Sequence, residues 1–433
     1  MISIFTVYSD ICKKSVPAHW QIRRFKDIIT LSRSGIWGDE EKGDANDIVC
    51  YRVADFDYSN LCLKFDNITY RNVLPEQANE KLLSEGDLLL EKSGGGEKMP
   101  VGRVVLVNSP QRAVCSNFIQ ALSVNKKQSA RFVLYLFHSI YSNRINTLFF
   151  NQTTGIQNLK TAHYLAQEIF LPPYSEQEAI AAYLDKECEK IGRKIELLER
   201  KADAYSRLRR SLINRTVTRG LDPNVSLKPS GLRWIPYIPT HWEISRVRNF
   251  FEYRNEKVSE TDFGPLSVTK NGVIPQMENV AKSLAEGDTR KKVCKNDFVA
   301  NSRSDRKGSC GTSPLDGSVS LIYIVLEPKN IFPNFVNYYF RSNDWVEEFY
   351  RNGKGIVADL WTTNYVTMRN IEIAVPPMEE QKEIAAYLDE KCAKIDTILE
   401  KINTEVERLK ELKRSLINEV VTGQRAIDTE SRS

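Results

Sequence analysis

The hexapeptide Ile180-Ala181-Ala182-Tyr183-Leu184-Asp185 occurs a second time, letter for letter, as Ile384-Ala385-Ala386-Tyr387-Leu388-Asp389. Arg210-Ser211-Leu212-Ile213-Asn214 likewise recurs as Arg414-Ser415-Leu416-Ile417-Asn418, at the same offset of 204 residues. Between the two motifs, apolar residues follow one another at steps of three or four: Ile180, Leu184, Cys188, Ile191, Ile195, Leu198, Ala202, Tyr205, Leu208 and Leu212. Each has an apolar partner one offset later, and such spacing keeps apolar side chains on one helix face. The sequence predicts two long amphipathic helices.

The ends of both helices can be read from their flanking residues. Pro172-Pro173 precedes the first helix, Ser175 to Glu178 form a capping-box pattern, and Gly220 follows the helix. The second helix begins after Pro376-Pro377 and stops near Gly423. About 35 residues at 1.5 Å each give a rod of roughly 50 Å. A single rod cannot bury its apolar stripe, so we expect the two rods to pair with each other, antiparallel.

The segments before the rods are also similar to each other, though less closely. Pro17-Ala18-His19-Trp20 matches Pro239-Thr240-His241-Trp242, and Glu85-Gly86-Asp87 matches Lys295-Asn296-Asp297. Patterning predicts strands at 87–92, 101–107, 297–301 and 319–326, and helices at 131–143 and 334–343. The expected fold is α+β: two strand-rich α+β domains separated by two long antiparallel, coiled-coil-like helices, with a pseudo-two-fold internal repeat. The predicted boundaries are 1–174 and 223–377 for the domains, 175–222 and 378–424 for the helical regions, and 425–433 for a flexible tail.

Composition limits the class of protein. The chain has 433 residues, of which 41% are hydrophobic and 27% charged, and no apolar run approaches the roughly 20 residues that span a bilayer. Met1 to Asp10 lack the features of a signal peptide, so we expect a cytoplasmic protein. The eight cysteines form no Cys-x-x-Cys motif and predict free thiols and no metal site. A net charge of +5 permits nucleic-acid binding without requiring it.

Two related but diverged domains at opposite ends of a fixed strut suit one task well. They can read two different short patterns on an extended, regular ligand, and duplex DNA is such a ligand. Because one turn of DNA is about 34 Å, a strut of roughly 50 Å places the readers more than one turn apart. The sequence therefore predicts a bipartite, asymmetric DNA target with an unread spacer.

The chain resembles the DNA-specificity subunits of Type I restriction-modification systems over nearly its full length. The resemblance is carried by Leu171-Pro172-Pro173 and Val375-Pro376-Pro377 with the hexapeptides that follow them, by the paired Arg-Ser-Leu-Ile-Asn motifs, and by 230–236 leading into 238–242. The N-terminal half departs from the family pattern, because Val16-Pro17-Ala18-His19-Trp20 lacks the upstream Gly-x-x-Trp. The resemblance implies that the diverged domains are target-recognition domains and that methyltransferase subunits dock on the rods.

Two loops occupy matching places after a predicted strand and carry residue types that contact DNA. They are the Gly-rich segment 91–98, followed by Arg103, and the segment 301–308. Lysines and arginines bind phosphates, whereas amides and hydroxyls also read bases; such loops are otherwise ordinary solvated turns. The candidate DNA-binding residues are Lys92, Ser93, Lys98, Arg103, Lys160, Lys270, Asn271, Arg303, Arg306, Lys307 and Lys354. Four of them, Lys160, Lys270, Asn271 and Lys354, lie near glycines outside the two loops.

Catalytic motifs are not recognisable. His19-Trp20 and His241-Trp242 lack partners in sequence, and we interpret them as structural anchors. Leu171-Pro172-Pro173-Tyr174 imitates the Asp/Asn-Pro-Pro-Tyr motif of amino-methyltransferases, but Leu replaces the polar acceptor. Gly94-Gly95-Gly96 lacks the Gly-Lys-Ser/Thr of a phosphate-binding loop, and Asp87 with Glu91-Lys92 lacks the usual nuclease spacing.

The sequence thus predicts a non-catalytic recognition subunit that binds double-stranded DNA and carries methyltransferase and restriction (motor/endonuclease) subunits to it. By resemblance, S-adenosylmethionine, ATP and Mg belong to the partner subunits, and this chain needs no cofactor. The alternative is a coiled-coil scaffold whose globular ends bind proteins, which would show almost no salt-dependent DNA binding. A self-contained methyltransferase would require S-adenosylmethionine binding by the isolated chain.

Overall fold

The computed structural model describes residues 16–108, 111–153, 155–276, 287, 289–355 and 362–427. The chain divides into two compact units: unit 1 comprises Met1–Leu198 and Thr404–Ser433, and unit 2 comprises Glu199–Asn403. Each unit contains strands and helices, as the α+β prediction expects. Residues Met1 to Asp10 and most of the expected tail at 425–433 lie outside the described residues.

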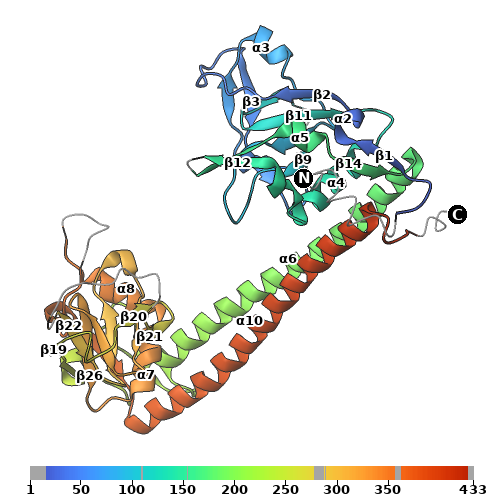
Figure 1. Ribbon diagram of the computed structural model, residues 1–433. Helices are drawn as coiled ribbons and strands as arrows, with labels where there is room; N and C mark the ends of the chain where they lie inside the picture. The colour runs from blue at the N-terminus through green and yellow to red at the C-terminus, as the bar shows by residue number, and fades with distance from the viewer. Residues whose placement is uncertain are drawn as a thin grey trace. The chain divides into compact units, whose positions relative to one another are not determined.

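Two long helices contribute to both units (Figure 1). Helix α6 spans Tyr174–Arg219 and helix α10 spans Met378–Val421. The first begins directly after Pro173, whose carbonyl accepts hydrogen bonds from the backbone N–H groups of Glu176 and Gln177. Ser175 therefore lies inside the first turn and does not cap it, so the predicted capping box is wrong. Gly220 and Gly423 follow the helix ends with positive φ angles of 74° and 73°, as the sequence predicts.

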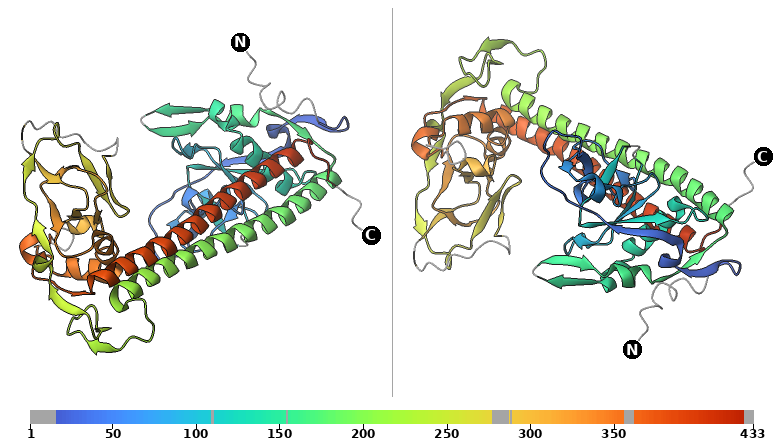
Figure 2. Two further views of the ribbon diagram at one scale, coloured as in Figure 1. Left: turned by 90° about the horizontal axis from the view of Figure 1, so that it is seen from below. Right: turned by 90° about the horizontal axis from the view of Figure 1, so that it is seen from above.

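Within each unit the segments of the two helices run antiparallel (Figure 2). In unit 1, Ile180 and Leu184 share a hydrophobic core with Leu416 and Val420, and Lys194 Nζ lies 3.1 Å from Glu405 Oε1. In unit 2, Val217 shares a core with Ile384 and Leu388, and Arg209 Nε lies 3.1 Å from Asp396 Oδ1. Full burial of such aliphatic side chains contributes about 1.5–3 kcal/mol each.

One position of the predicted stripe is wrong in both helices. Leu208 is 52% exposed and its repeat counterpart Leu412 is 51% exposed. Two consecutive steps of three residues, through 202, 205 and 208 and again through 406, 409 and 412, turn the stripe by about 120° at 100° per residue. These leucines therefore lie at the edge of the apolar face, outside the buried seam.

The domain of unit 1 is built from four small sheets around helix α4 (Ala130–Ser142). The largest has six strands in the order β2 (Ile29–Ser34), β11 (Ile119–Val124), β7 (Leu88–Glu91), β9 (Val104–Leu106), β5 (Cys62–Leu63) and β4 (Phe56–Asp57). The others are β10 (Ala113–Cys115) with β3 (Asp47–Tyr51) and β6 (Tyr70–Asn72); β12 (Phe150–Thr153) with β13 (Ile156–Leu159) and β8 (Ser93–Gly94); and β1 (Gln21–Arg24) with β14 (Glu168–Leu171). Short helices α2 (Phe25–Ile28), α3 (Pro75–Asn79) and α5 (Thr161–Leu165) connect them.

The domain of unit 2 has a four-stranded sheet in the order β18 (Phe251–Tyr253), β26 (Tyr323–Pro328), β23 (Phe298–Asn301) and β24 (Cys310–Thr312). Smaller sheets are β19 (Lys257–Val258) with β22 (Arg290–Val293) and β25 (Gly317–Ser320), and the pairs β20 (Leu266–Thr269) with β21 (Gly272–Pro275), β17 (Glu243–Arg246) with β27 (Glu372–Val375), and β15 (Leu227–Pro229) with β16 (Tyr237–Pro239). Its helices are α7 (Pro333–Tyr339), α8 (Asn343–Arg351) and α9 (Tyr365–Met368). The predicted strand at 319–326 is two strands, because the chain turns between β25 and β26.

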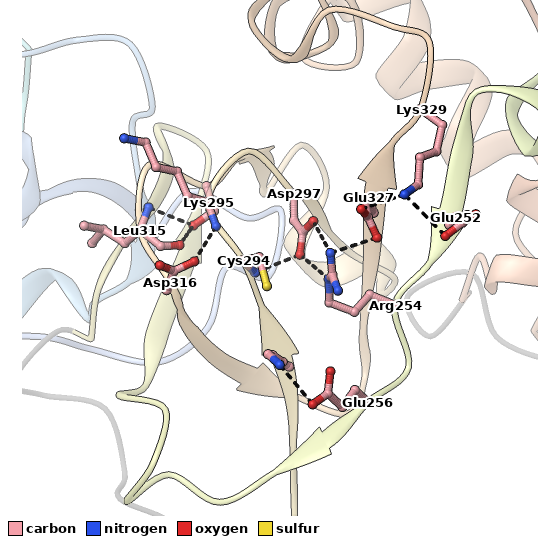
Figure 3. A network of polar contacts seen from close by, with 12 residues as sticks. Glu252, Arg254, Glu256, Cys294, Lys295, Asp297, Leu315, Asp316, Glu327 and Lys329 are labelled. Atoms are coloured by element: carbon pink, nitrogen blue, oxygen red, sulfur yellow. Dashed lines mark hydrogen bonds and ion pairs between the residues drawn. The ribbon is translucent and has the colours of Figure 1, made fainter.

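The matching aspartates Asp87 and Asp297 close the same turn in each unit. A residue with positive φ precedes each aspartate, Gly86 at 89° and Asn296 at 75°. Each carboxylate accepts a backbone N–H from three residues earlier, at 2.9 Å and 2.8 Å. Each is also paired with an arginine, Arg33 in unit 1 and Arg254 in unit 2, where Arg254 Nε lies 2.6 Å from Asp297 (Figure 3). The resemblance between the two domains therefore includes their buried polar contacts.

Candidate nucleic-acid interface

The His-Trp pairs hold the ends of the long helices. In unit 1, Glu176 in the first turn of α6 accepts from Trp20 Nε1 at 3.0 Å and lies 2.7 Å from His19 Nε2. In unit 2, Glu380 of α10 makes the equivalent contacts with Trp242, at 3.1 Å, and with His241, at 2.7 Å. We call each group a clasp. The interpretation of these residues as structural anchors accounts for the contacts.

Each clasp also touches the end of the other long helix. A Cβ atom at Gly423, beyond α10, would lie 2.5 Å from Pro17 Cδ and 3.5 Å from the Trp20 ring. A Cβ atom at Gly220, beyond α6, would lie 2.7 Å from Glu380 Oε1 and 3.6 Å from the Trp242 ring. The tryptophan of each domain thus packs between the start of one long helix and the end of the other.

In unit 1 the Gly-rich segment and the segment around Gly155, which are distant in sequence, lie side by side. Ser93 Oγ donates to Asn158 Oδ1 at 2.7 Å, and β8 pairs with β13. The backbone N–H of Leu159 donates to the carbonyl of Lys92 at 2.8 Å, which places the exposed Lys160 beside that strand. Lys92, Ser93 and Lys160 therefore belong to one surface region.

Two of the predicted cations in this region are partly committed to other contacts. Lys92 Nζ donates to Ser34 Oγ and Gln120 Oε1, and burial lowers the pKa of its ammonium group. Arg103 donates from Nε and Nη2 to both oxygens of Glu91, at 2.8 Å and 3.0 Å, and its guanidinium lies 4.0 Å from the centre of the Tyr58 ring. The Arg103 side chain is only 10% exposed. Arg103 therefore forms part of a wall that is fixed by internal contacts, and its predicted contact with DNA stays a prediction.

That wall belongs to an open cleft of about 940 Å³. The three glycines Gly94–Gly96 and the exposed side chains of Lys98, Met99 and Phe118 line it, together with Trp37. Lys98 is a rim residue on the loop between β8 and β9, and its carbonyl accepts from Arg144 Nη2 at 3.3 Å. The sequence predicted the loop but not the cleft, because Trp37 and Phe118 come from distant segments.

Sequence reasoning also missed the β12–β13 hairpin beside this cleft. Asn151 and Asn158 are opposite each other in the hairpin, and both are exposed, as is Ile156. Two-stranded ribbons with amide side chains are suited to reading bases in the major groove. The signal was present in the sequence, since amide residues flank Gly155 on both sides at 151–152 and 157–158.

In unit 2, three separate segments meet at Thr362. Arg303 and Lys354 each form a β-bridge with Thr362, so that two residues predicted independently lie on the same small surface. Arg303 pairs with Asp305 at 3.2 Å, and Lys307 pairs with Glu347 at 2.7 Å. The Arg306 side chain, at 71% exposed, is more exposed than those of Arg303 and Lys307, and its contact with Asp305 is long, at 3.9 Å.

Lys270 and Asn271 form the exposed tip of the β20–β21 hairpin. Gly272 follows with a φ of 115°, which an L side chain rarely adopts. The carbonyl of Lys270 accepts from Arg341 Nη2 at 2.9 Å, which ties the tip to the segment after α7. The side chains of both tip residues remain available to solvent.

Disulfides, groups of metal ligands and membrane-spanning helices are not found in the described part of the chain. Its seven cysteines are free, with Cys62 and Cys294 half-buried and the other five buried. Among the described residues no group of three or more His, Cys, Asp or Glu is placed to hold a metal ion. No helix among them has the length and apolar character to span a membrane.

Comparisons with known proteins agree with this architecture. A family model described as the Type I restriction modification DNA specificity domain matches residues 17–201 and 239–408. The chain is 22% identical over 432 residues to the putative type I restriction enzyme MjaX specificity subunit of Methanocaldococcus jannaschii, covering 96% of this chain and 95% of that protein. It is also 22% identical to the type I restriction enzyme EcoKI specificity subunit of Escherichia coli K12, covering 94% and 90%.

Solved structures share the fold. One similar chain comes from a structural study of complex assembly and conformational transition in the type I R-M system. It gives a TM-score of 0.68 at 15% identity, with 94% of this chain and 98% of that chain covered. The HsdS subunit of Thermoanaerobacter tengcongensis gives a TM-score of 0.51 at 15% identity, with 95% and 98% covered. Since the family model covers most of the sequence, the chain belongs to the family of Type I restriction-modification DNA-specificity subunits.

Proposed function

We propose that this chain recognises a two-part, asymmetric DNA sequence, with one half read by each domain, and contributes no catalytic step of its own. The observation that carries the proposal is that the two domains share a set of internal contacts, which we call the frame, whereas their exposed loops differ. The clasps and the aspartate turns recur in both units. The paired contacts of Tyr135 with Asp185, at 2.6 Å, and of Tyr338 with Asp389, at 2.7 Å, recur as well.

The candidate contact surfaces on that shared frame are different in kind. Unit 1 offers an apolar cleft with Lys98 at its rim and an amide-bearing hairpin, whereas unit 2 offers the exposed cations Arg306 and Lys354 and the tip at Asn271. Base edges are read by side-chain hydrogen bonds and apolar contacts, while phosphates are held by cations. Because the contact surfaces of the two domains differ, the two half-sites should differ as well, and the target should not be palindromic.

The repeated long helices provide the proposed docking surface for the partner subunits. In this proposal methyltransferase and restriction subunits dock on the long helices, whose repeated Leu208 and Leu412 are exposed apolar positions. S-adenosylmethionine, ATP and Mg would bind to those partners in the cytoplasm. The methylation of adenine and the ATP-driven cleavage of DNA would be activities of the assembled complex.

Mapping modified adenines in cells that carry the complete system tests the proposal directly. We expect one recurring sequence with two unlike halves and an unread spacer between them. A palindromic motif, a single uninterrupted motif, or no modification that depends on this chain would contradict it.

A titration of the full-length chain with random-sequence duplex separates this proposal from the scaffold alternative. A recognition subunit should lose affinity steeply as salt rises, because cations displaced from phosphates contribute to binding. A scaffold with protein-binding ends should bind duplex weakly and with almost no salt dependence.

A further inference from the structure

The cleft of unit 1 is more apolar than phosphate contact requires. Trp37 is 38% exposed, Phe118 is 45% exposed and Met99 is 58% exposed, and all three line it. Large apolar side chains left in solvent within one concave site indicate a ligand with flat apolar surface. The backbone and phosphates of a regular duplex do not offer such a surface, whereas an unstacked base does.

Two of the walls are suited to stacking. The guanidinium of Arg71 lies 4.5 Å from the centre of the Trp37 ring and holds that ring in place. Arg71 also donates to the carbonyls of Trp37 and Gly38, each at 3.1 Å. The Arg103 guanidinium lies 4.0 Å from the centre of the Tyr58 ring and donates two hydrogen bonds to Glu91, so its planar group is fixed as well. Fixed aromatic and guanidinium planes are the platforms on which nucleobases stack.

The glycine segment gives a flat base access to polar groups. A Cβ atom at Gly96 would meet nothing within 4 Å, and one at Gly94 would meet only Glu91 Oε1, at 3.9 Å. The exposed amide of Asn117, which also lines the cleft, offers donors and an acceptor for the edge of a base. Lys98 at the rim suits the attached phosphate, although Glu97 beside it opposes that attraction.

We infer that the cleft formed by Trp37, Phe118, Met99, Arg103 and the glycines Gly94–Gly96 binds one nucleobase of the DNA that has left the duplex stack. The inference rests on the proposed function and adds to it a specific mode of contact for the first domain. A volume of about 940 Å³ falls within the range of small-molecule sites and leaves room for a base with its sugar. Removing a base from the stack has a cost in free energy, which is smaller when the base is already unpaired.

The test measures the affinity of the full-length chain for two fluorescent duplex pools of random sequence at the same salt concentration. One pool is perfectly paired, and the other carries a single bulged 2-aminopurine, whose fluorescence falls when it stacks on an aromatic ring. Because the bulged base is already unpaired, we expect the chain to bind the bulged pool about tenfold more tightly and to quench its fluorescence.

The variants use two independent ways of blocking the cleft. Phe118→Ala removes a platform, and Gly96→Leu adds a side chain at a position where the backbone conformation and the surrounding space tolerate one. Both should lose the preference for the bulged pool while keeping salt-dependent binding of the paired pool. Phe65→Ala is the matched control, since Phe65 is 44% exposed in the same unit and does not line the cleft.

The outcomes separate the two proposals. Equal affinity of the parent chain for both pools, or an undiminished preference in both cleft variants, would overturn the inference and leave DNA recognition standing. Failure of the parent chain to bind either pool in a salt-dependent manner would count against the proposed function itself.

Discussion

Arg103 and Arg306 show what a single sequence can and cannot say about a side chain. The sequence predicts both as DNA contacts, Arg103 just after the Gly-rich loop and Arg306 inside the matching loop. In the structure Arg103 is enclosed by Glu91 and Tyr58, whereas Arg306 is 71% exposed. The difference comes from residues distant in sequence, and it makes Arg306 the better candidate for phosphate contact.

Arg306→Ala should weaken binding to duplex DNA of any sequence and reduce the slope of log affinity against log salt by about 1. The physical reason is the loss of one cation that displaces a condensed counterion from the DNA. Arg193→Ala is the control, because Arg193 is 72% exposed and also ion-paired but lies on helix α6. Unchanged affinity and slope in the Arg306 variant, measured by fluorescence anisotropy, would remove Arg306 from the interface.

His138 in helix α4 should make unit 1 sensitive to mild acid. Burial, and secondarily the charge of Lys413, lowers the pKa of His138 to about 4. Between pH 6.5 and pH 4 the unfolded chain takes up a proton at this site and the folded chain does not, so stability falls as the pH falls. From pH 7 to pH 5 the contribution amounts to about 2 kcal/mol.

Urea unfolding of the parent chain and of His138→Asn at both pH values measures that contribution. The variant is expected to be less stable at pH 7 and to lose less stability between pH 7 and pH 5 than the parent does. Parallel losses in the two proteins would show that His138 does not carry the effect.

At the scale of elements, leucines of the long helices differ in burial, and substitutions at them should differ in their effect on stability. Leu388 is fully buried and Leu412 is half exposed on the same helix, α10. Leu388→Asp should lower the free energy of unfolding by about 3 kcal/mol or more, because it leaves a charge without a partner in the core of unit 2. Leu412→Asp should change it little. Leu198→Asp, on the half-buried stripe of α6, should fall between them, and equal denaturation midpoints for all three would contradict the pairing.

Substituting alanine for glycine should have opposite effects at the end of a long helix and inside one. Gly423→Ala should destabilise unit 1 by about 1 kcal/mol or more, because Gly423 has a φ of 73° and a Cβ there would lie 2.5 Å from Pro17. Gly192→Ala, inside α6 with nothing within 4 Å of its Cβ position, should stabilise the helix by up to about 1 kcal/mol. Thermal unfolding of both variants measures the two shifts, and shifts of the same sign would contradict this account of the helix end.

The elements were predicted unequally well, and the physical reason is the range of the interactions involved. The long helices, their glycine ends, helix α4 and strands β7 and β23 follow from local periodicity and were predicted. The exposure of Leu208 and Leu412 follows from the angular drift of the stripe, which counting the apolar steps left out. The cleft is lined by Trp37 and Phe118 from distant segments, and such tertiary proximity is not encoded in spacing.

At the scale of the whole molecule, the repeated internal contacts stabilise the two domains, whereas the diverged loops are the surfaces proposed to recognise DNA. Residues that recur in both units, such as Trp20 with Trp242 and Asp87 with Asp297, form internal contacts. The surfaces proposed to contact DNA have no such identity. Changes in the loops of one domain should therefore leave the other domain intact.

A double variant, Lys270→Ala with Asn271→Ala, is expected to relax or change one half of the recognised sequence and leave the other half as it was. Both side chains are exposed at a hairpin tip, so the fold of unit 2 should be retained. Mapping of modified adenines in cells that carry the variant system is the measurement. Simultaneous changes in both halves would contradict the assignment of one half to each domain.

Unit 1 is built from two segments that are distant in sequence, and this affects the order in which the domains fold during synthesis. Its core needs Leu416, Ile417, Val420 and Val421, which a ribosome adds long after the rest of that domain, whereas unit 2 is continuous from Glu199 to Asn403. The domain synthesised first is therefore completed last, and in the interval its apolar groove is open to chaperones or to aggregation. Nonsense mutations after Asn403 should damage the amino-terminal domain more than the central one.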